Sequence, residues 1–169
     1  MVQEPWQEKL QSILKRAAGE ERQNRVAIVG IGNSLQGDDA AGVETAHELS
    51  LLVDDCEDLI VVNAGSAPEN LTGVLRRFEP DWVLLIDAAD MGEEPGTLRW
   101  VDWSETNGIS ASSHTLPLSM LSRYLVEELK CEVALLGIQP RALSFGGPLS
   151  GPVQHAVDLL VSEICRLVA

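Results

Sequence analysis

Apolar runs typical of buried strands recur along the chain at intervals that leave room for helices. The runs VAIVG at 26–30 and WVLLID at 82–87 are continuous rather than alternating, which indicates strands covered on both faces. Several of the stretches between such runs carry apolar residues at the three- and four-residue spacing of a helix. We therefore expect strands at 26–30, 59–63, 82–87, 98–102 and 132–138, and helices at 38–53, 70–77, 117–130 and 152–168.

This alternation of strands and helices predicts the fold class. Parallel strands need crossover connections, and helices in those connections cover both faces of the sheet. We expect an α/β fold, a three-layer α/β/α sandwich around a mostly parallel, twisted, five-stranded sheet. In open sheets of this kind ligands bind beyond the carboxyl ends of the strands, so the functional residues are expected in the loops at that edge.

A short amphipathic helix is predicted before the first strand. Pro5 suits a first helical turn, and Gly19 suits a C-terminal stop. We expect this helix at 5–18 and divide the chain into an N-terminal helix and linker at 1–24 and an α/β domain at 25–169. The helix is expected to pack on the domain or on a partner, outside the active site.

The acidic balance of the chain limits its partners. Twelve Lys and Arg against 26 Asp and Glu give a formal net charge of −14. Such a surface repels phosphate, which argues against general nucleic-acid binding and against anionic membranes, whereas a basic peptide or a cationic metal would suit it. No apolar run approaches the roughly 20 residues of a membrane span and no signal peptide is recognisable, so we expect a cytoplasmic protein without membrane insertion.

Length and cysteine content fit a single intracellular domain. The chain has 169 residues, which favours one domain over two, and leaves the oligomeric state open, a monomer included. Cys56, Cys131 and Cys165 are odd in number and show neither C-x-x-C spacing nor a disulfide framework. We expect reduced thiols that are mostly buried.

The loop after the first strand carries two adjacent carboxylates. It begins with Gly30-Ile-Gly, as a dinucleotide-binding loop does, but Leu35 stands at the third glycine position of that motif. Asp38 and Asp39 then follow where a nucleotide phosphate would bind, and their charge would repel it. The two side chains either cap the following helix or serve the site. We weigh these roles evenly for Asp38 and favour a functional role for Asp39.

Asp87 and His114 would complete a candidate metal site together with Asp39. Asp87 ends an apolar strand, where an isolated buried carboxylate is costly unless it is hydrogen-bonded or bound to a cation. His114 lies in a loop expected on the same side, so Asp39, Asp87 and His114 would make an open divalent-metal site. His47 and His155 are expected on surface helices instead.

A serine hydrolase is a weaker interpretation of the same loops. Ser34 would be the nucleophile, with Asp87 and His114 completing a triad. The nucleophile elbow G-x-S-x-G, however, requires a glycine where this chain has Gln36.

Taken together, five segments resemble one known family. They occur in order and with matching spacing across about residues 26–168, and resemble the [NiFe]-hydrogenase maturation proteases, the hydrogenase-3 type most of all. The segments are GIGNSLQGDDAAG (30–42), NAGSAPEN (63–70), LLIDAADMG (84–92), SSHTLPLS (112–119) and LLGIQP (135–140).

The resemblance implies a nickel-dependent endopeptidase that removes the C-terminal extension of a hydrogenase large-subunit precursor after nickel insertion. The nickel would arrive mostly on the precursor. The family's nickel-contacting residues fall on Asp39, Asp87 and His114, where this sequence has Asp rather than Glu at the first position. Either the metal or a carboxylate, Asp39 or Asp38, would activate the water. The alternatives are a serine-type hydrolase that uses Ser34 and a non-catalytic metal or assembly chaperone.

Overall fold

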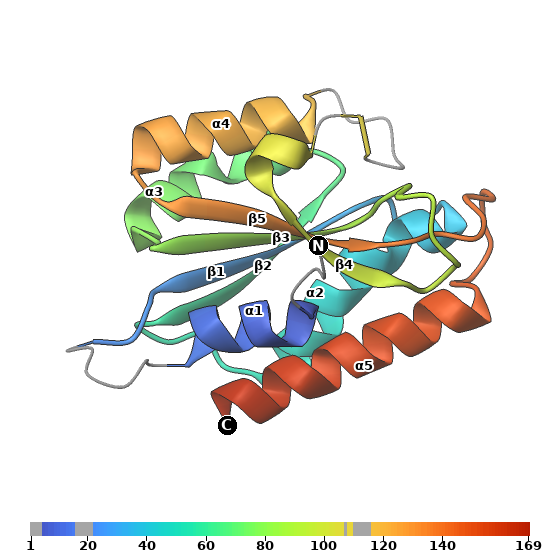
Figure 1. Ribbon diagram of the computed structural model, residues 1–169, viewed down its shortest axis with the longest axis horizontal. Helices are drawn as coiled ribbons and strands as arrows, with labels where there is room; N and C mark the ends of the chain where they lie inside the picture. Colours follow the sequence, from blue (N-terminus) through green and yellow to red (C-terminus); the bar gives the residue numbers. More distant parts are fainter. Residues whose placement is uncertain (1–4, 16–21, 107, 110–115) are drawn as a thin grey trace.

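The protein is built around one five-stranded sheet, shown in Figure 1 as a computed structural model that describes residues 5–15, 22–106, 108–109 and 116–169. The strand order is β2-β1-β3-β5-β4, and only β4 runs antiparallel to its neighbour. The expected α/β fold with a mostly parallel sheet is therefore confirmed. The strands are β1 (Val26–Ile31), β2 (Leu59–Gly65), β3 (Trp82–Ala88), β4 (Leu98–Asp102) and β5 (Glu132–Ile138).

Helices cover both faces of this sheet, each over its own hydrophobic cluster. The helices α1 (Trp6–Leu14), α2 (Ala41–Leu52) and α5 (Gly151–Val168) bury apolar side chains against one face. The helices α3 (Thr72–Phe78) and α4 (Leu118–Leu129) do so on the other. Figure 1 shows the two layers on opposite sides of the strands. The alternation of side chains along each buried strand supplies both clusters, which is why the strands are apolar throughout.

Helix ends differ from the expected ones where the backbone turns tightly. The predicted helix at 38–53 begins instead as a 3-10 turn, Gly37–Ala40, before α2 proper. The predicted helix at 70–77 likewise starts after a 3-10 turn, Pro68–Leu71. At the N-terminus α1 ends at Leu14, because Lys15 is extended.

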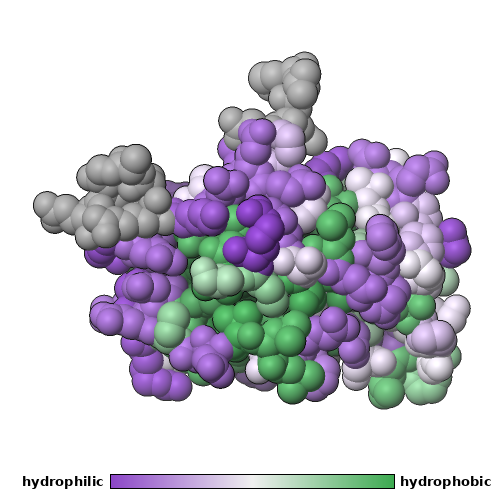
Figure 2. Space-filling view, turned by 90° about the horizontal axis from the view of Figure 1, so that it is seen from below, coloured by the Kyte–Doolittle hydropathy of each residue, from purple (hydrophilic) through white to green (hydrophobic). Residues whose placement is uncertain are grey.

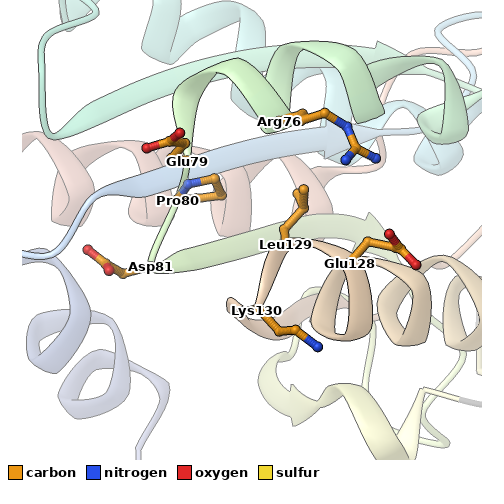
Figure 3. A pocket seen from close by; sticks show the side chains of 7 residues that line it. All are labelled: Arg76, Glu79, Pro80, Asp81, Glu128, Leu129 and Lys130. Carbon is orange, nitrogen blue, oxygen red and sulfur yellow. The ribbon is translucent and has the colours of Figure 1, made fainter.

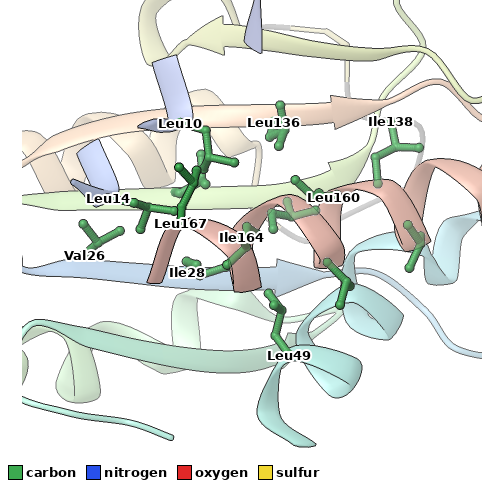
Figure 4. Packing of buried hydrophobic residues seen from close by; sticks show 14 of the residues in the cluster. Leu10, Leu14, Val26, Ile28, Leu49, Leu136, Ile138, Leu160, Ile164 and Leu167 are labelled. Atoms are coloured by element: carbon green, nitrogen blue, oxygen red, sulfur yellow. The ribbon is translucent and has the colours of Figure 1, made fainter. Parts of the chain in front are cut away.

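The N-terminal helix contributes to the same core as the sheet. Leu10 and Leu14 of α1 pack in one cluster with Leu136 of β5 and Leu167 of α5, as Figure 4 shows. Beyond the helix, Asn24 donates a side-chain hydrogen bond to the Ile13 carbonyl oxygen. The helix thus packs on the α/β domain, on the face opposite α3 and α4.

The surface over α5 retains some apolar area. Figure 2 looks onto this face and shows apolar side chains gathered in its middle, with polar side chains around them. Exposed apolar residues near this face include Leu159 of α5 and Leu51 at the end of α2. Of the helices that the structure describes, none is long and apolar enough to cross a membrane.

The three cysteines are free thiols in different surroundings. Cys131 is buried, and burial raises its pKa to about 11. Cys165 is half-buried and burial also raises its pKa, whereas Cys56 is exposed. The expectation of free thiols is confirmed, but the expectation that they are mostly buried is wrong for Cys56.

Candidate functional site

The sheet topology places a switch point at the carboxyl ends of β1 and β3, and we call this place the crevice. From β1 the chain crosses through α2 to β2 on one side, whereas from β3 it continues to β4 on the other side. Loops that leave two neighbouring strands in opposite directions open a crevice, and ligands of doubly wound sheets bind there. Asp39 follows β1 and Asp87 lies near the end of β3, so both carboxylates belong to the segments that meet at this switch point.

Close backbone packing places Asp39 against the end of β3. A methyl group on Gly42 would lie 2.1 Å from the Ile86 carbonyl oxygen and 2.2 Å from that of Ile31. Only glycine lets the first turn of α2 rest directly on both strands. The 3-10 turn Gly37–Ala40, which carries Asp39, contacts β3 as a result.

Asp39 is buried within its own turn. Its Oδ2 atom accepts a hydrogen bond from the Asn33 backbone N–H at 3.1 Å. Its backbone N–H donates to the Gln36 carbonyl oxygen at 3.0 Å. These bonds fix the Asp39 carboxylate at the base of the loop rather than on the exposed surface of α2.

Asp87 is buried at the other side of the crevice. It lies beside Gly137 of β5, and strand alternation places its side chain on the face where Val83 and Leu85 pack under α3 and α4. His114, the third predicted ligand, lies outside the described residues. Within the described part of the chain, no three His, Cys, Asp or Glu side chains are close enough to hold a metal by themselves.

Asp38 joins the first loop to the loop before α5. Its Oδ2 atom accepts from the backbone N–H groups of Arg141 and Ala142 at 2.8 and 3.0 Å and from the Ser150 hydroxyl at 2.8 Å. Its Oδ1 atom accepts from the Ser150 backbone N–H at 2.7 Å. Burial alone would raise the pKa of Asp38, but these hydrogen bonds outweigh it and hold the pKa below its usual value.

These four bonds change how Asp38 is interpreted. Both of its oxygens are engaged by the chain itself. This arrangement favours a positioning role for Asp38 over the general-base role that the sequence also allowed. Asp38 is then a link between two loops, while the adjacent Asp39 lies at the crevice.

Gln139 is a positioning residue that the sequence did not single out. It directly follows β5 and is buried, and its Oε1 atom accepts from the backbone N–H groups of Met91 and Glu93 at 2.7 and 3.3 Å. Its Nε2 atom donates to Asp90 Oδ1 at 3.3 Å. Gln139 thus shapes the loop after Asp87. The sequence signal that could have identified Gln139 is a polar amide side chain placed immediately after an apolar strand.

The remaining sequence candidates lie apart from this arrangement. Ser34 is exposed, and in the described part of the chain its side chain has no hydrogen-bond partner that would activate it as a nucleophile. His47 and His155 are exposed on α2 and α5, as expected. Asp90 accepts a hydrogen bond from the Gly92 backbone N–H, as a turn residue does.

Among the cavities lined by residues that the structure describes, two lie at opposite ends of the strands. A cavity of about 400 Å³ opens where β3 and β5 begin, and Figure 3 shows the side chains around it, none of which is a candidate site residue. A smaller cavity of about 230 Å³ lies at the carboxyl edge. Ser34, Gly37, Glu44 and Leu149 are among the residues that line it, so it adjoins the loops that Asp38 joins.

Replacing Gly42 by alanine tests the close packing at the crevice. The added methyl group would meet two carbonyl oxygens at the distances given above, so we expect Gly42→Ala to lower the free energy of unfolding by about 2–3 kcal/mol. Gly73→Ala in α3 is the matched control, because its added methyl group would have no neighbour nearer than 3.7 Å. Urea denaturation of both variants is the measurement, and equal stability for the two would contradict the packing argument.

The comparisons of this chain with known proteins all point to the same protein family. A family model described as hydrogenase maturation protease matches residues 43–167. The hydrogenase 3 maturation protease of Escherichia coli is 34% identical over 140 residues, which are 79% of this chain and 85% of that protein.

Solved structures agree with the sequence matches. The crystal structure of a [NiFe] hydrogenase maturation protease from Thermococcus kodakarensis superimposes with a TM-score of 0.81 at 31% identity, over 95% of this chain and 98% of the other. The solution structure of an endopeptidase from Escherichia coli gives a TM-score of 0.71 at 33% identity, over 85% and 88% of the two chains.

Proposed function

This chain belongs to the hydrogenase maturation protease family, and on that premise we propose that the crevice between β1 and β3 makes peptide cleavage dependent on nickel. The protein is an endopeptidase whose substrate is the large-subunit precursor of a [NiFe]-hydrogenase. The reaction hydrolyses one peptide bond and removes the C-terminal extension of that precursor.

The observation that carries the nickel proposal is the pair of buried carboxylates. Both are buried, Asp39 in the turn after β1 and Asp87 near the end of the neighbouring strand β3, and that turn contacts β3. Carboxylate oxygens together with an imidazole are suitable ligands for a divalent metal. The sequence assigns the imidazole to His114.

We treat nickel as part of the substrate. Nickel already held by the precursor would gain Asp39, Asp87 and His114 as further ligands, and this would hold the neighbouring peptide bond in the crevice. Each factor of ten in discrimination between loaded and empty precursor requires about 1.4 kcal/mol from those contacts. Specificity for correctly loaded precursor then follows from binding.

The water that attacks the peptide bond needs activation. Nickel can polarise the carbonyl group or lower the pKa of a bound water. A carboxylate can instead accept the proton of the water as general base. Because Asp38 is committed to the loop before α5, we assign the carboxylate route to Asp39 and give Asp38 the task of holding the site together.

Cleavage of purified precursor with and without nickel tests the proposal. We expect the enzyme to shorten the nickel-loaded precursor at least a hundredfold faster than the nickel-free one, which corresponds to about 2.7 kcal/mol. Intact-mass spectrometry gives the product. Equal rates on both precursors would refute nickel gating but leave the peptidase, whereas an uncut loaded precursor would refute the proposed function itself.

The same assay separates the two alternatives raised by the sequence. A serine-type hydrolase would lose activity in Ser34→Ala, which is exposed and otherwise harmless to the fold. A non-catalytic chaperone would bind the precursor without shortening it. Our proposal predicts full activity for Ser34→Ala and a shortened product.

A further inference from the structure

Two loops beside the crevice expose large apolar side chains to solvent. Leu35 is 58% exposed, Leu143 is 40% exposed and Phe145 is 79% exposed. We call these three residues the apolar rim. Large apolar side chains gathered on a surface mark sites of protein interaction more often than they occur by chance.

The two loops form one continuous surface. The Gly146 backbone N–H donates to the Leu35 carbonyl oxygen at 2.7 Å, and the Asp38 backbone N–H donates to that of Ala142 at 2.9 Å. Gly37 fits closely between them, since a methyl group there would lie 3.0 Å from the Ala142 carbonyl oxygen. In Figure 1 the loop between β5 and α5 lies beside the start of α2 at the right of the view.

The rim is uncharged in a strongly acidic protein. Neither 33–37 nor 142–150 contains a charged residue, although the chain has a formal net charge of −14. The Phe145 side chain is mostly exposed, so it contributes little to the hydrophobic core of this chain. An apolar partner can therefore contact these two segments without burying a charged residue that belongs to them.

The rim adjoins the turn that carries Asp39. The turn that includes Leu35 is hydrogen-bonded to Asp39 through Asn33 and Gln36. Building on the proposed function, we propose that the apolar rim binds apolar side chains of the precursor polypeptide next to the bond that is cleaved. Phe145 is the main contact, because it is the most exposed of the three.

The location of the rim favours the precursor polypeptide over a second copy of the chain as its binding partner. A second copy seated on Leu35 and Phe145 would stand over the turn that carries Asp39 and would obstruct the precursor. A single peptide segment covers less of the surface, so it can bind beside that turn. The rim then adds affinity for the polypeptide, while Asp39 and Asp87 respond to its metal.

Steady-state kinetics on nickel-loaded precursor tests this role. We expect Phe145→Ser to raise KM at least tenfold with kcat unchanged, because the contact is made equally before and during the reaction. Leu143→Ser is expected to shift KM in the same direction by a smaller factor. Leu51→Ser is the matched control, since Leu51 is 72% exposed at the far end of α2, and it is expected to keep KM within twofold.

The outcomes separate the docking proposal from the proposed function. Cleavage by the wild type with an unchanged KM for Phe145→Ser would overturn the docking surface and leave the protease function intact. A wild type that fails to cut the loaded precursor would overturn both. Analytical ultracentrifugation of each variant tests whether a second copy of the chain binds the rim instead. If the wild type is a dimer, and Phe145→Ser dissociates it without changing KM, the rim is a dimer contact and the proposal is overturned.

Discussion

Asp39→Asn and Asp87→Asn are each expected to lower kcat/KM for nickel-loaded precursor about a thousandfold, which is the size of effect that removal of a catalytic proton acceptor or metal ligand produces. Asparagine keeps the size of each buried side chain and removes its charge. At position 39 the amide oxygen can still accept the Asn33 backbone N–H, so the turn is expected to persist. His114→Ala is expected to act in the same direction, on the basis of the sequence.

The control for these variants removes a carboxylate that lies elsewhere. Asp54→Asn changes an exposed side chain after α2 and is expected to retain wild-type kcat/KM. Circular dichroism and thermal unfolding of all variants show whether the fold is intact. Near-wild-type cleavage by folded Asp87→Asn would exclude Asp87 from nickel docking and from the reaction.

Asp38→Ala is expected to have the largest effect on stability, lowering the free energy of unfolding by about 4 kcal/mol. The substitution leaves three backbone N–H groups and the Ser150 hydroxyl without their acceptor. In Asp38→Asn the amide NH₂ group must face at least one of these donors, so it is expected to lose about half as much. Guanidinium denaturation measures both values.

The stabilisation by Asp38 is also expected to depend on pH in one direction. Its pKa is lower in the folded protein than in the unfolded chain, so the charged form favours folding. The contribution is complete above about pH 4, the ordinary carboxyl pKa, and is lost as pH falls through the lower folded value. Asp38→Asn is therefore expected to flatten the acid limb of the stability profile.

An exposed aspartate supplies the comparison for Asp38. Asp55 is exposed and accepts one backbone hydrogen bond, from Val61. Asp55→Ala is expected to cost less than about 1 kcal/mol. A loss of the same size for Asp38→Ala would mean that the links to Ser150 and to Arg141–Ala142 contribute little.

Local sequence pattern was sufficient for the fold and singled out two candidate site residues. Continuous apolar runs gave the strands because a strand covered on both faces has no polar side. Asp39 could be singled out in the loop that follows such a run, and Asp87 at the end of another, because parallel strands bring their carboxyl ends to one edge.

Contacts between distant segments were beyond that pattern. Asp38 and Ser150 are 112 residues apart, and nothing near either one indicates the other. The buried amide of Gln139, the close approach of Gly42 to β3 and the exposed Leu35–Phe145 rim likewise depend on where loops meet in space. The spacing of apolar residues shows which side of a helix or strand faces the core. The sequence by itself therefore determined the α/β sandwich and the acidic edge of the sheet. The pairing of loops depends on chain topology and on hydrogen bonds made only after folding, so only the tertiary structure showed that Asp38 links two loops while Asp39 is held within its own turn.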